Sequence, residues 1–281
     1  MFLTVSFLWL FRQNLINWII FVLIFEVPKI DFMNDLVSII TPTYNSAKYI
    51  EFTIDSVIKQ TYRNWEMIIV DDNSLDETVE IIQKHIHFDD RIKLIELDKN
   101  YGPAIARNKA IENAKGKFIS FLDSDDIWMP SKLEKQVNFL KKNNYPICFT
   151  TYELIDKNNH RLNKVLHAVR CLDLHNYLKD TRIGFSTSMI NKEIVGKFEM
   201  MNIRTRQDGQ LWIFLMKRGF KAYGIDEILC QYRVHKDSIS ANKIKATINI
   251  WKLYYKIEKL GLFKSCYYFS HYLTNAIKKR I

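Results

Sequence analysis

Three carboxylates within four residues follow a short apolar run in the middle of the sequence. The run Phe118–Leu122 has the length and composition of a buried strand, and Asp123, Asp125 and Asp126 come directly after it. Carboxylates at the carboxyl end of a parallel strand lie where open α/β sheets bind ligands. A D-x-D pair there suits Mg²⁺ or Mn²⁺, which usually bind one or two carboxylates together with substrate phosphates. Taken alone, the four residues also fit a solvated acidic loop that caps the next helix.

The elements before this loop predict a parallel α/β sheet. Apolar runs predict four strands, at 36–41, 65–70, 92–97 and 118–122. Amphipathic helices are expected between them, the first capped by Asn45 or Ser46 and the second by a capping box of Ser74 and Glu77. Strands alternating with helices are typical of a parallel sheet with right-handed crossovers. We therefore expect the polar ends of the first, second and fourth strands to meet at one edge.

The second half of the chain is less regular. Strands are predicted at 147–154 and 184–190, and the segment 222–229 leads into Tyr232–Lys236. Arg206–Gly209 precedes an amphipathic helix that contains Leu211–Met216, and Asp208 is a candidate for its N-cap.

The net charge of +10 is concentrated in the tail, where residues 241–281 hold nine Lys or Arg against the single acid Glu258. The pattern of aromatic residues and lysines in this tail predicts amphipathic helices, which suit an anionic membrane surface. A helix that packs back on the domain with a solvated basic face is the alternative. No nucleic-acid recognition motif accompanies the charge, so we expect no nucleic-acid partner. The four scattered cysteines fit a reducing compartment.

The first residues are apolar in two short runs, Met1–Phe11 and Leu15–Phe25. Each run is too short to span a bilayer. Two interpretations stay open for residues 1–32: an interfacial anchor, or an upstream extension of a reading frame whose working start is Met33.

Five motifs in a fixed order carry a family resemblance. They are VSIITPTYN (37–45), VDDNS (70–74), ARN (106–108), FLDSDD (121–126) and QDGQLW (207–212). The chain resembles the family 2 glycosyltransferases with a GT-A fold, in particular the bacterial enzymes that build lipopolysaccharide, O-antigen or capsule.

The resemblance implies an α/β fold, a Rossmann-like and mostly parallel central sheet flanked by helices, with a C-terminal helical appendage. The glycosyltransferase domain would cover 33–240, divided into a nucleotide-sugar-binding half at 33–130 and an acceptor half at 131–240. The basic aromatic tail would cover 241–281.

The resemblance also assigns the donor-binding residues. Tyr44 would lie beside the nucleotide base, and Asp72 would accept the uracil N3–H, which favours uridine or thymidine. Arg107 would approach the base or the diphosphate. Thr41, Asp123 and Ser124 complete the nucleotide-sugar-binding set.

Metal and catalytic roles follow from the same motifs. Asp125 would be the direct ligand of Mn²⁺ or Mg²⁺, with Asp123 toward the ribose or a metal-bound water. His235, with Arg233 and Lys236, would lie in a loop that closes over the diphosphate, and its imidazole suits Mn²⁺. Asp208 would be the catalytic base of an inverting transfer. The family often has Glu-Asp where this chain has Gln207-Asp208.

The sequence thus predicts an inverting, metal-dependent glycosyltransferase that uses a nucleotide-diphosphate sugar, with UDP as the expected nucleotide. Its acceptor would be a saccharide, lipid-linked, at the cytoplasmic face of the cytoplasmic membrane. A catalytically silent nucleotide-sugar-binding or scaffold protein at the membrane is the alternative, which Gln207 keeps open. A sugar-nucleotide pyrophosphorylase would need a Gly-rich loop after the first strand, and TPTYN has none.

Overall fold

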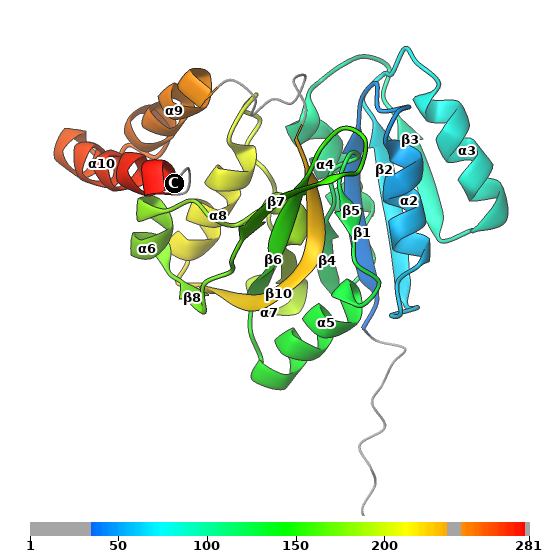
Figure 1. Cartoon of the computed structure of the whole chain (residues 1–281), viewed down its shortest axis with the longest axis horizontal. Coiled ribbons are helices and arrows are strands. Elements are labelled where there is room, and N and C mark those ends of the chain that lie inside the picture. The colour runs from blue at the N-terminus through cyan, green and yellow to red at the C-terminus, as the bar shows by residue number, and fades with distance from the viewer. Residues whose placement is uncertain (1–34, 235–242, 279–281) are drawn as a thin grey trace, which may run out of the picture. The chain divides into compact units, whose positions relative to one another are not determined.

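The computed structural model of this chain describes residues 35–234 and 243–278 (Figure 1), which belong to one compact unit. The predicted N-terminal extension and His235 lie outside the described residues. The strands are β1 Val37–Thr43, β2 Trp65–Asp71, β3 Ile92–Glu96, β4 Phe118–Phe121, β5 Ile127–Trp128, β6 Ile147–Ile155, β7 Arg161–Leu166, β8 Cys171–Leu172, β9 Met189–Asn191 and β10 Ala222–Arg233. The helices are α2 Ile50–Ile58, α3 Thr78–Phe88, α4 Pro103–Asn113, α5 Lys132–Asn143, α6 Leu174–Lys179, α7 Lys192–Val195, α8 Gln207–Lys217, α9 Lys243–Lys252 and α10 Leu262–Lys278.

The strands form one mixed sheet in the order β3-β2-β1-β4-β9-β6-β10-β5, with β7 on β6 and β8 on β10. The four strands β3, β2, β1 and β4 are all parallel, as the sequence predicts. The short strand β9 is antiparallel to both β4 and β6, and β6 is parallel to β10. The carboxyl ends of β1, β2 and β4 therefore lie at the same edge.

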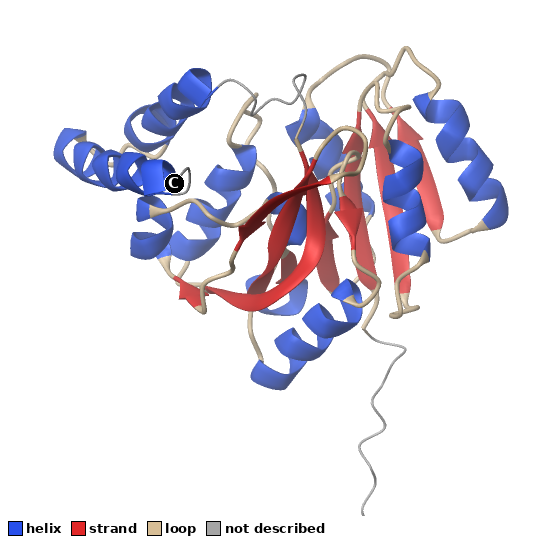
Figure 2. Ribbon diagram, in the orientation of Figure 1, coloured by secondary structure: helices blue, strands red, loops and turns tan. Residues whose placement is uncertain are grey.

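Helices lie on both faces of this sheet (Figure 2), and each face has its own apolar core. Because strand side chains alternate between faces, Ile39 packs with α2, α3 and α5, while Ile40 packs with α4 and α8. The α/β/α layering is the reason that apolar runs such as Phe118–Leu122 have no polar alternation.

Three sequence predictions are wrong in detail. Neither Asn45 nor Ser46 caps the first helix, because the N-cap of α2 is Tyr49, which makes no side-chain cap bond. The predicted strand 184–190 is a 3₁₀ turn, Phe185–Thr187, followed by the short strand β9. Thr187 and Ser188 donate their hydroxyls to the carbonyls of Gly184 and Phe185, and such local bonds compete with a strand ladder. The predicted capping box also does not form, because the Ser74 hydroxyl donates to the Asp71 carboxylate instead.

The tail packs on the domain. After α9 a π-helical turn, Leu253–Ile257, leads into α10, and α10 lies against α6 (Figure 1). Ile250, Leu253 and Tyr254 are fully buried in the α8 side of the core. The Tyr254 hydroxyl donates to the Leu178 carbonyl at 2.6 Å. None of the helices within the described ranges is both long and apolar enough to cross a membrane.

Candidate active site

The loops that follow β1 and β2 are joined by side chain to main chain bonds. The Asn45 N–H donates to the Ser74 hydroxyl, and the Leu75 N–H donates to Asn45 Oδ1, both at 2.8 Å. Asn45 and Asn73 have φ of +48° and +65°, in the left-handed region that asparagine tolerates better than most residues. These loops are thereby fixed to each other.

The loop after β4 joins them through a pair of serines. The hydroxyl oxygens of Ser46 and Ser124 are 2.8 Å apart and share one hydrogen bond. The predicted convergence of the first, second and fourth strand ends is therefore confirmed. Ser124 is engaged by a neighbouring loop, so its contact with a donor stays a prediction.

Asp72 fixes the turn that leads into helix α4. Its carboxylate is buried and accepts the main-chain N–H of Tyr101 at 2.7 Å and of Gly102 at 2.8 Å. Gly102 has φ +92° and ψ 162°, a conformation available almost only to glycine. Each carboxylate oxygen can accept more than one hydrogen bond, so Asp72 can still accept a nucleobase N–H.

Arg107 reaches from α4 to the acidic loop. Its Nη2 is 2.6 Å from Asp123 Oδ1, and its guanidinium lies 4.6 Å from the centre of the Phe185 ring. The main-chain N–H of Asp123 donates to the Ser186 hydroxyl at 3.1 Å. Within the described residues Arg107 Nε is buried without a hydrogen-bond partner. The ion pair holds Asp123 at the floor of the site.

Asp126 has a role that sequence reasoning missed. It is 1% exposed, accepts the Ser186 hydroxyl on one oxygen, and accepts the Arg233 N–H on the other at 2.9 Å. Burial, followed by the charges of Asp125 and Asp123, raises the pKa of this carboxyl. No local pattern could reveal these partners, because they lie 60 and 107 residues away.

Arg233 is not part of an open loop, which corrects the sequence prediction. It is the last residue of β10 and is 1% exposed. Its Nε donates to the Asp125 carbonyl at 2.7 Å and its Nη1 to the Asp156 carbonyl at 2.9 Å. The guanidinium therefore supports the acidic loop from inside the domain.

The residues predicted at the end of β1 differ in exposure. Tyr44 is 46% exposed and is available to a ligand. Thr41 is fully buried in β1, and Thr43, closer to the edge, is 3% exposed. Neither hydroxyl has a hydrogen-bond partner among the described residues. Contact of Thr41 with a nucleotide stays a prediction.

Asp208 lies in the first turn of α8 and is not its N-cap. The N-cap is Arg206, whose φ of +64° is left-handed. Trp212, one turn after Asp208, packs edge-on against Phe121, two residues before Asp123. Residues four apart lie on the same face of a helix, so Asp208 lies on the face of α8 from which Trp212 contacts Phe121. The Asp208 charge also contributes, after burial, to raising the pKa of Tyr177.

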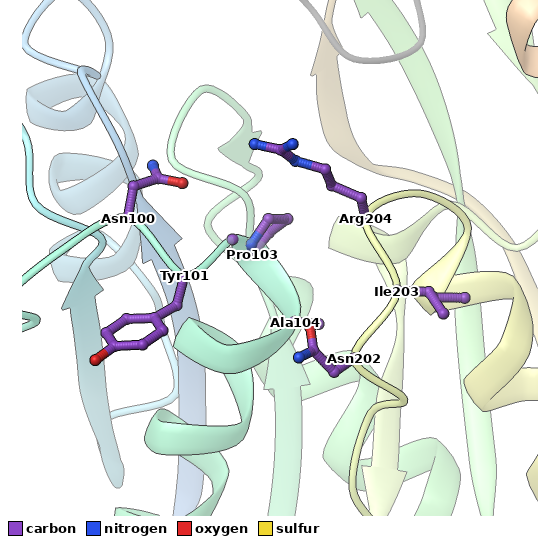
Figure 3. A pocket seen from close by; sticks show the side chains of 8 residues that line it. Asn100, Tyr101, Pro103, Ala104, Asn202, Ile203 and Arg204 are labelled. Atoms are coloured by element: carbon purple, nitrogen blue, oxygen red, sulfur yellow. The ribbon is translucent and has the colours of Figure 1, made fainter.

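A pocket of about 310 Å³ separates the start of α4 from the segment that leads to α8 (Figure 3). It is lined by Asn100–Ala104 on one side and Asn202, Ile203 and Arg204 on the other. In Figure 3 the Arg204 side chain extends above the start of α4.

The acidic loop suits a divalent cation that a ligand helps to hold. In the part of the chain that the structure describes, no three His, Cys, Asp or Glu side chains form a metal site by themselves. Mg²⁺ and Mn²⁺ do not require one, because one or two carboxylates plus phosphate oxygens and waters complete their shell. The carboxylates of Asp123 and Asp125 fit this chemistry.

Known proteins resemble most of this chain. The glycosyl transferase family 2 model matches residues 38–205. The Bacillus subtilis (strain 168) protein named for teichuronic acid biosynthesis, glycosyltransferase TuaG, is 47% identical over 246 residues, 88% of this chain and 98% of that protein. Escherichia coli WfgD, named as a UDP-Glc:alpha-D-GlcNAc-diphosphoundecaprenol beta-1,3-glucosyltransferase, is 37% identical over 87% of this chain and 94% of its own.

Solved structures share the fold. S. aureus TarS (1–349) in complex with UDP-GlcNAc superposes with a TM-score of 0.62 at 19% identity, covering 79% of this chain and 67% of that one. Mannosyltransferase PcManGT from Pyrobaculum calidifontis, in complex with GDP-Man and Mn²⁺, gives a TM-score of 0.62 at 19% identity over 80% and 65%. The GT-A architecture is thereby confirmed, and with the family match and the two curated relatives the chain belongs to glycosyl transferase family 2.

Proposed function

We propose that this glycosyltransferase moves a sugar from a UDP-sugar to a lipid-linked saccharide with inversion at the anomeric carbon. One observation carries the proposal. The loops after β1, β2 and β4 are bonded into one floor that bears Asp72, Asp123 and Asp125. The relative WfgD, whose name specifies a UDP-Glc donor and a diphosphoundecaprenol acceptor, supports the substrate classes.

The donor nucleotide would lie against Tyr44 and Asp72. Tyr44 offers an exposed ring for stacking on a base, and Asp72 is already fixed by two main-chain donors. Because the Asp72 carboxylate is already held in place, it would favour a nucleobase that presents an N–H to it, as uracil does at N3. Arg107 would hold the Asp123 carboxylate toward the donor.

The diphosphate would bind beside the acidic loop. A divalent cation held by Asp125 and Asp123 would neutralise the diphosphate as it leaves. Arg233 and Asp126 keep this loop in place through bonds to its main chain and to β10.

Asp208 would act as the base. As the acceptor hydroxyl oxygen forms a bond to the anomeric carbon, its proton passes to the Asp208 carboxylate. The bond from that carbon to the diphosphate oxygen breaks on the opposite face, and UDP leaves with the electron pair. A positioned base of this kind contributes about 10²–10⁴-fold to the rate.

The tail would hold the enzyme at an anionic membrane on the cytoplasmic side. Its inner face is buried on the domain, while Leu262 and Phe263 are 53% and 89% exposed beside the exposed lysines Lys259 and Lys264. Apolar side chains flanked by lysines suit the interface of an anionic bilayer.

The test is UDP release from a panel of UDP-, GDP- and dTDP-sugars, with and without Mn²⁺ or Mg²⁺. We expect metal-dependent release from one donor, lost in Asp125→Ala. Asp208→Asn should bind that donor and fail to transfer to a lipid-linked acceptor. Asp90→Asn is the matched control, because Asp90 is an exposed carboxylate just before β3, at the sheet edge opposite the carboxyl ends of the strands. Folded protein that binds no donor would refute the proposal, and binding without turnover would favour a silent nucleotide-sugar-binding protein.

A further inference from the structure

Asn108 bonds to both main-chain groups of a single distant residue. Its Nδ2 donates to the Met200 carbonyl at 2.8 Å, and the Met200 N–H donates to Asn108 Oδ1 at 2.7 Å. The two residues are 92 positions apart. A side-chain amide that satisfies both groups of one peptide residue fixes its position and orientation, as a neighbouring strand would.

The segment held in this way leads to the candidate base. Residues 196–206 contain neither helix nor strand. They are attached at Met200 to α4, and at Arg206 to the tail, through a bond from Arg206 Nη2 to the Ala246 carbonyl at 3.3 Å. Asp208 follows two residues after the second attachment.

The same segment forms one wall of the 310 Å³ pocket, and α4 forms the other (Figure 3). Asn108 comes directly after Arg107, whose guanidinium holds Asp123. The Asn108–Met200 bonds therefore set the distance between the helix that anchors the acidic loop and the segment that carries Arg204 and leads to Asp208.

We propose that Asn108 is a positioning residue that holds the acceptor-side wall, residues 202–204, in register with the donor-binding loops, and that the pocket between them receives the acceptor saccharide. The inference rests on the proposed transferase function. Misplacement of a reacting group by about 1 Å costs on the order of 100-fold in rate. Loss of the two bonds should thus impair transfer and leave donor binding intact.

Asn108→Ala tests this with two activity measurements. We expect UDP release without acceptor to stay within about twofold of wild type, while kcat/KM for the acceptor falls on the order of 10- to 100-fold. Asn113→Ala is the matched control, because Asn113 lies on the same helix and its exposed amide donates to the Lys109 carbonyl of that helix. Unchanged transfer, or an equal fall in hydrolysis and transfer, would overturn the proposal.

Hydrogen–deuterium exchange tests the attachment independently of activity. Asn108→Ala should increase exchange in peptides covering 198–206 and leave those covering 43–47 and 123–126 unchanged, with no effect in Asn113→Ala. Unchanged exchange at 198–206 would refute the positioning role even if the proposed transferase function itself fails. Should Asn108→Ala not fold, the exposed Arg204→Ala should still raise the acceptor KM, and an unaltered KM would refute the pocket assignment.

Discussion

The main-chain N–H of Arg233 donates to the Asp126 carboxylate at 2.9 Å, so the end of β10 is tied to the acidic loop after β4. The Arg233 guanidinium adds a second tie, to the Asp125 carbonyl. The end of β10 and the loop after β4 are far apart in the sequence, and the buried Asp126 carboxyl joins them. The position of the predicted metal-binding residues depends on it.

Asp126→Ala should destabilise the fold strongly. It would leave the Ser186 hydroxyl and the Arg233 N–H without their buried acceptor, and each such loss costs about 1–3 kcal/mol. Asp126→Asn should be much milder, because Oδ1 can still accept from Arg233 and Nδ2 can donate to the Ser186 oxygen. Urea denaturation of the two variants checks this, and equal loss in both would contradict it.

Lys132 makes stability depend on pH. It is fully buried, its Nζ donates to Ser120 and Gln136, and burial lowers its pKa to about 7. Between pH 7 and pH 9 the unfolded chain holds this proton and the folded chain has released it, so stability rises with pH. The slope is about 1.4 kcal/mol per pH unit.

The measurement compares the free energy of unfolding of wild type and Lys132→Met from pH 6 to pH 9. The stability of wild type relative to the variant should rise with that slope above pH 7 and level off below it. The range stops at pH 9 because burial raises the pKa of Cys148 to about 12, which adds a second effect of opposite sign. Parallel curves for the two proteins would show that Lys132 stays charged.

Gly102 can be compared with Gly219, since both have a left-handed φ, +92° and +91°, and neither would bring a Cβ within 4 Å of another atom. An alanine at either position should cost about 1–3 kcal/mol of stability through backbone strain alone. Only Gly102→Ala should also weaken binding of the UDP-sugar, because Gly102 donates to Asp72. Calorimetric titration with UDP would decide, and equal affinities in the two variants would contradict a role for this turn in donor binding.

Shortening a side chain should have different effects on the buried and the exposed face of the tail. Leu253→Ala, at a fully buried position, should cost about 2–5 kcal/mol of stability. Phe263→Ala, at an 89% exposed position, should leave stability unchanged and reduce sedimentation with vesicles that contain anionic lipid. Binding by Phe263→Ala equal to wild type, or no binding by wild type at low salt, would argue that the outer face does not contact membranes.

The sequence was informative where the signal is local. Apolar runs located β1, β2, β3 and β4, and the polar residues after them identified the edge where three loops meet. The strand expected at 184–190 does not form, because the hydroxyls of Thr187 and Ser188 bond to nearby carbonyls. This local conformation depends on the packing of Phe185 against Phe121, which is a contact between distant parts of the chain. The sequence does not reveal the roles of Asn108, Asp126 and Arg233. Each of these residues acts through hydrogen bonds to partners that are at least 60 residues away in the chain.

The burial of the tail has a consequence for how such enzymes diverge. Ile250, Leu253 and Tyr254 belong to the core that supports α8, so the tail is not an exchangeable module that recombination can replace. A chain that ends after β10 would expose this apolar surface to water. Divergence in what the outer face contacts must therefore proceed by point substitution, at positions such as Leu262 and Phe263, while the inward positions keep their size and shape.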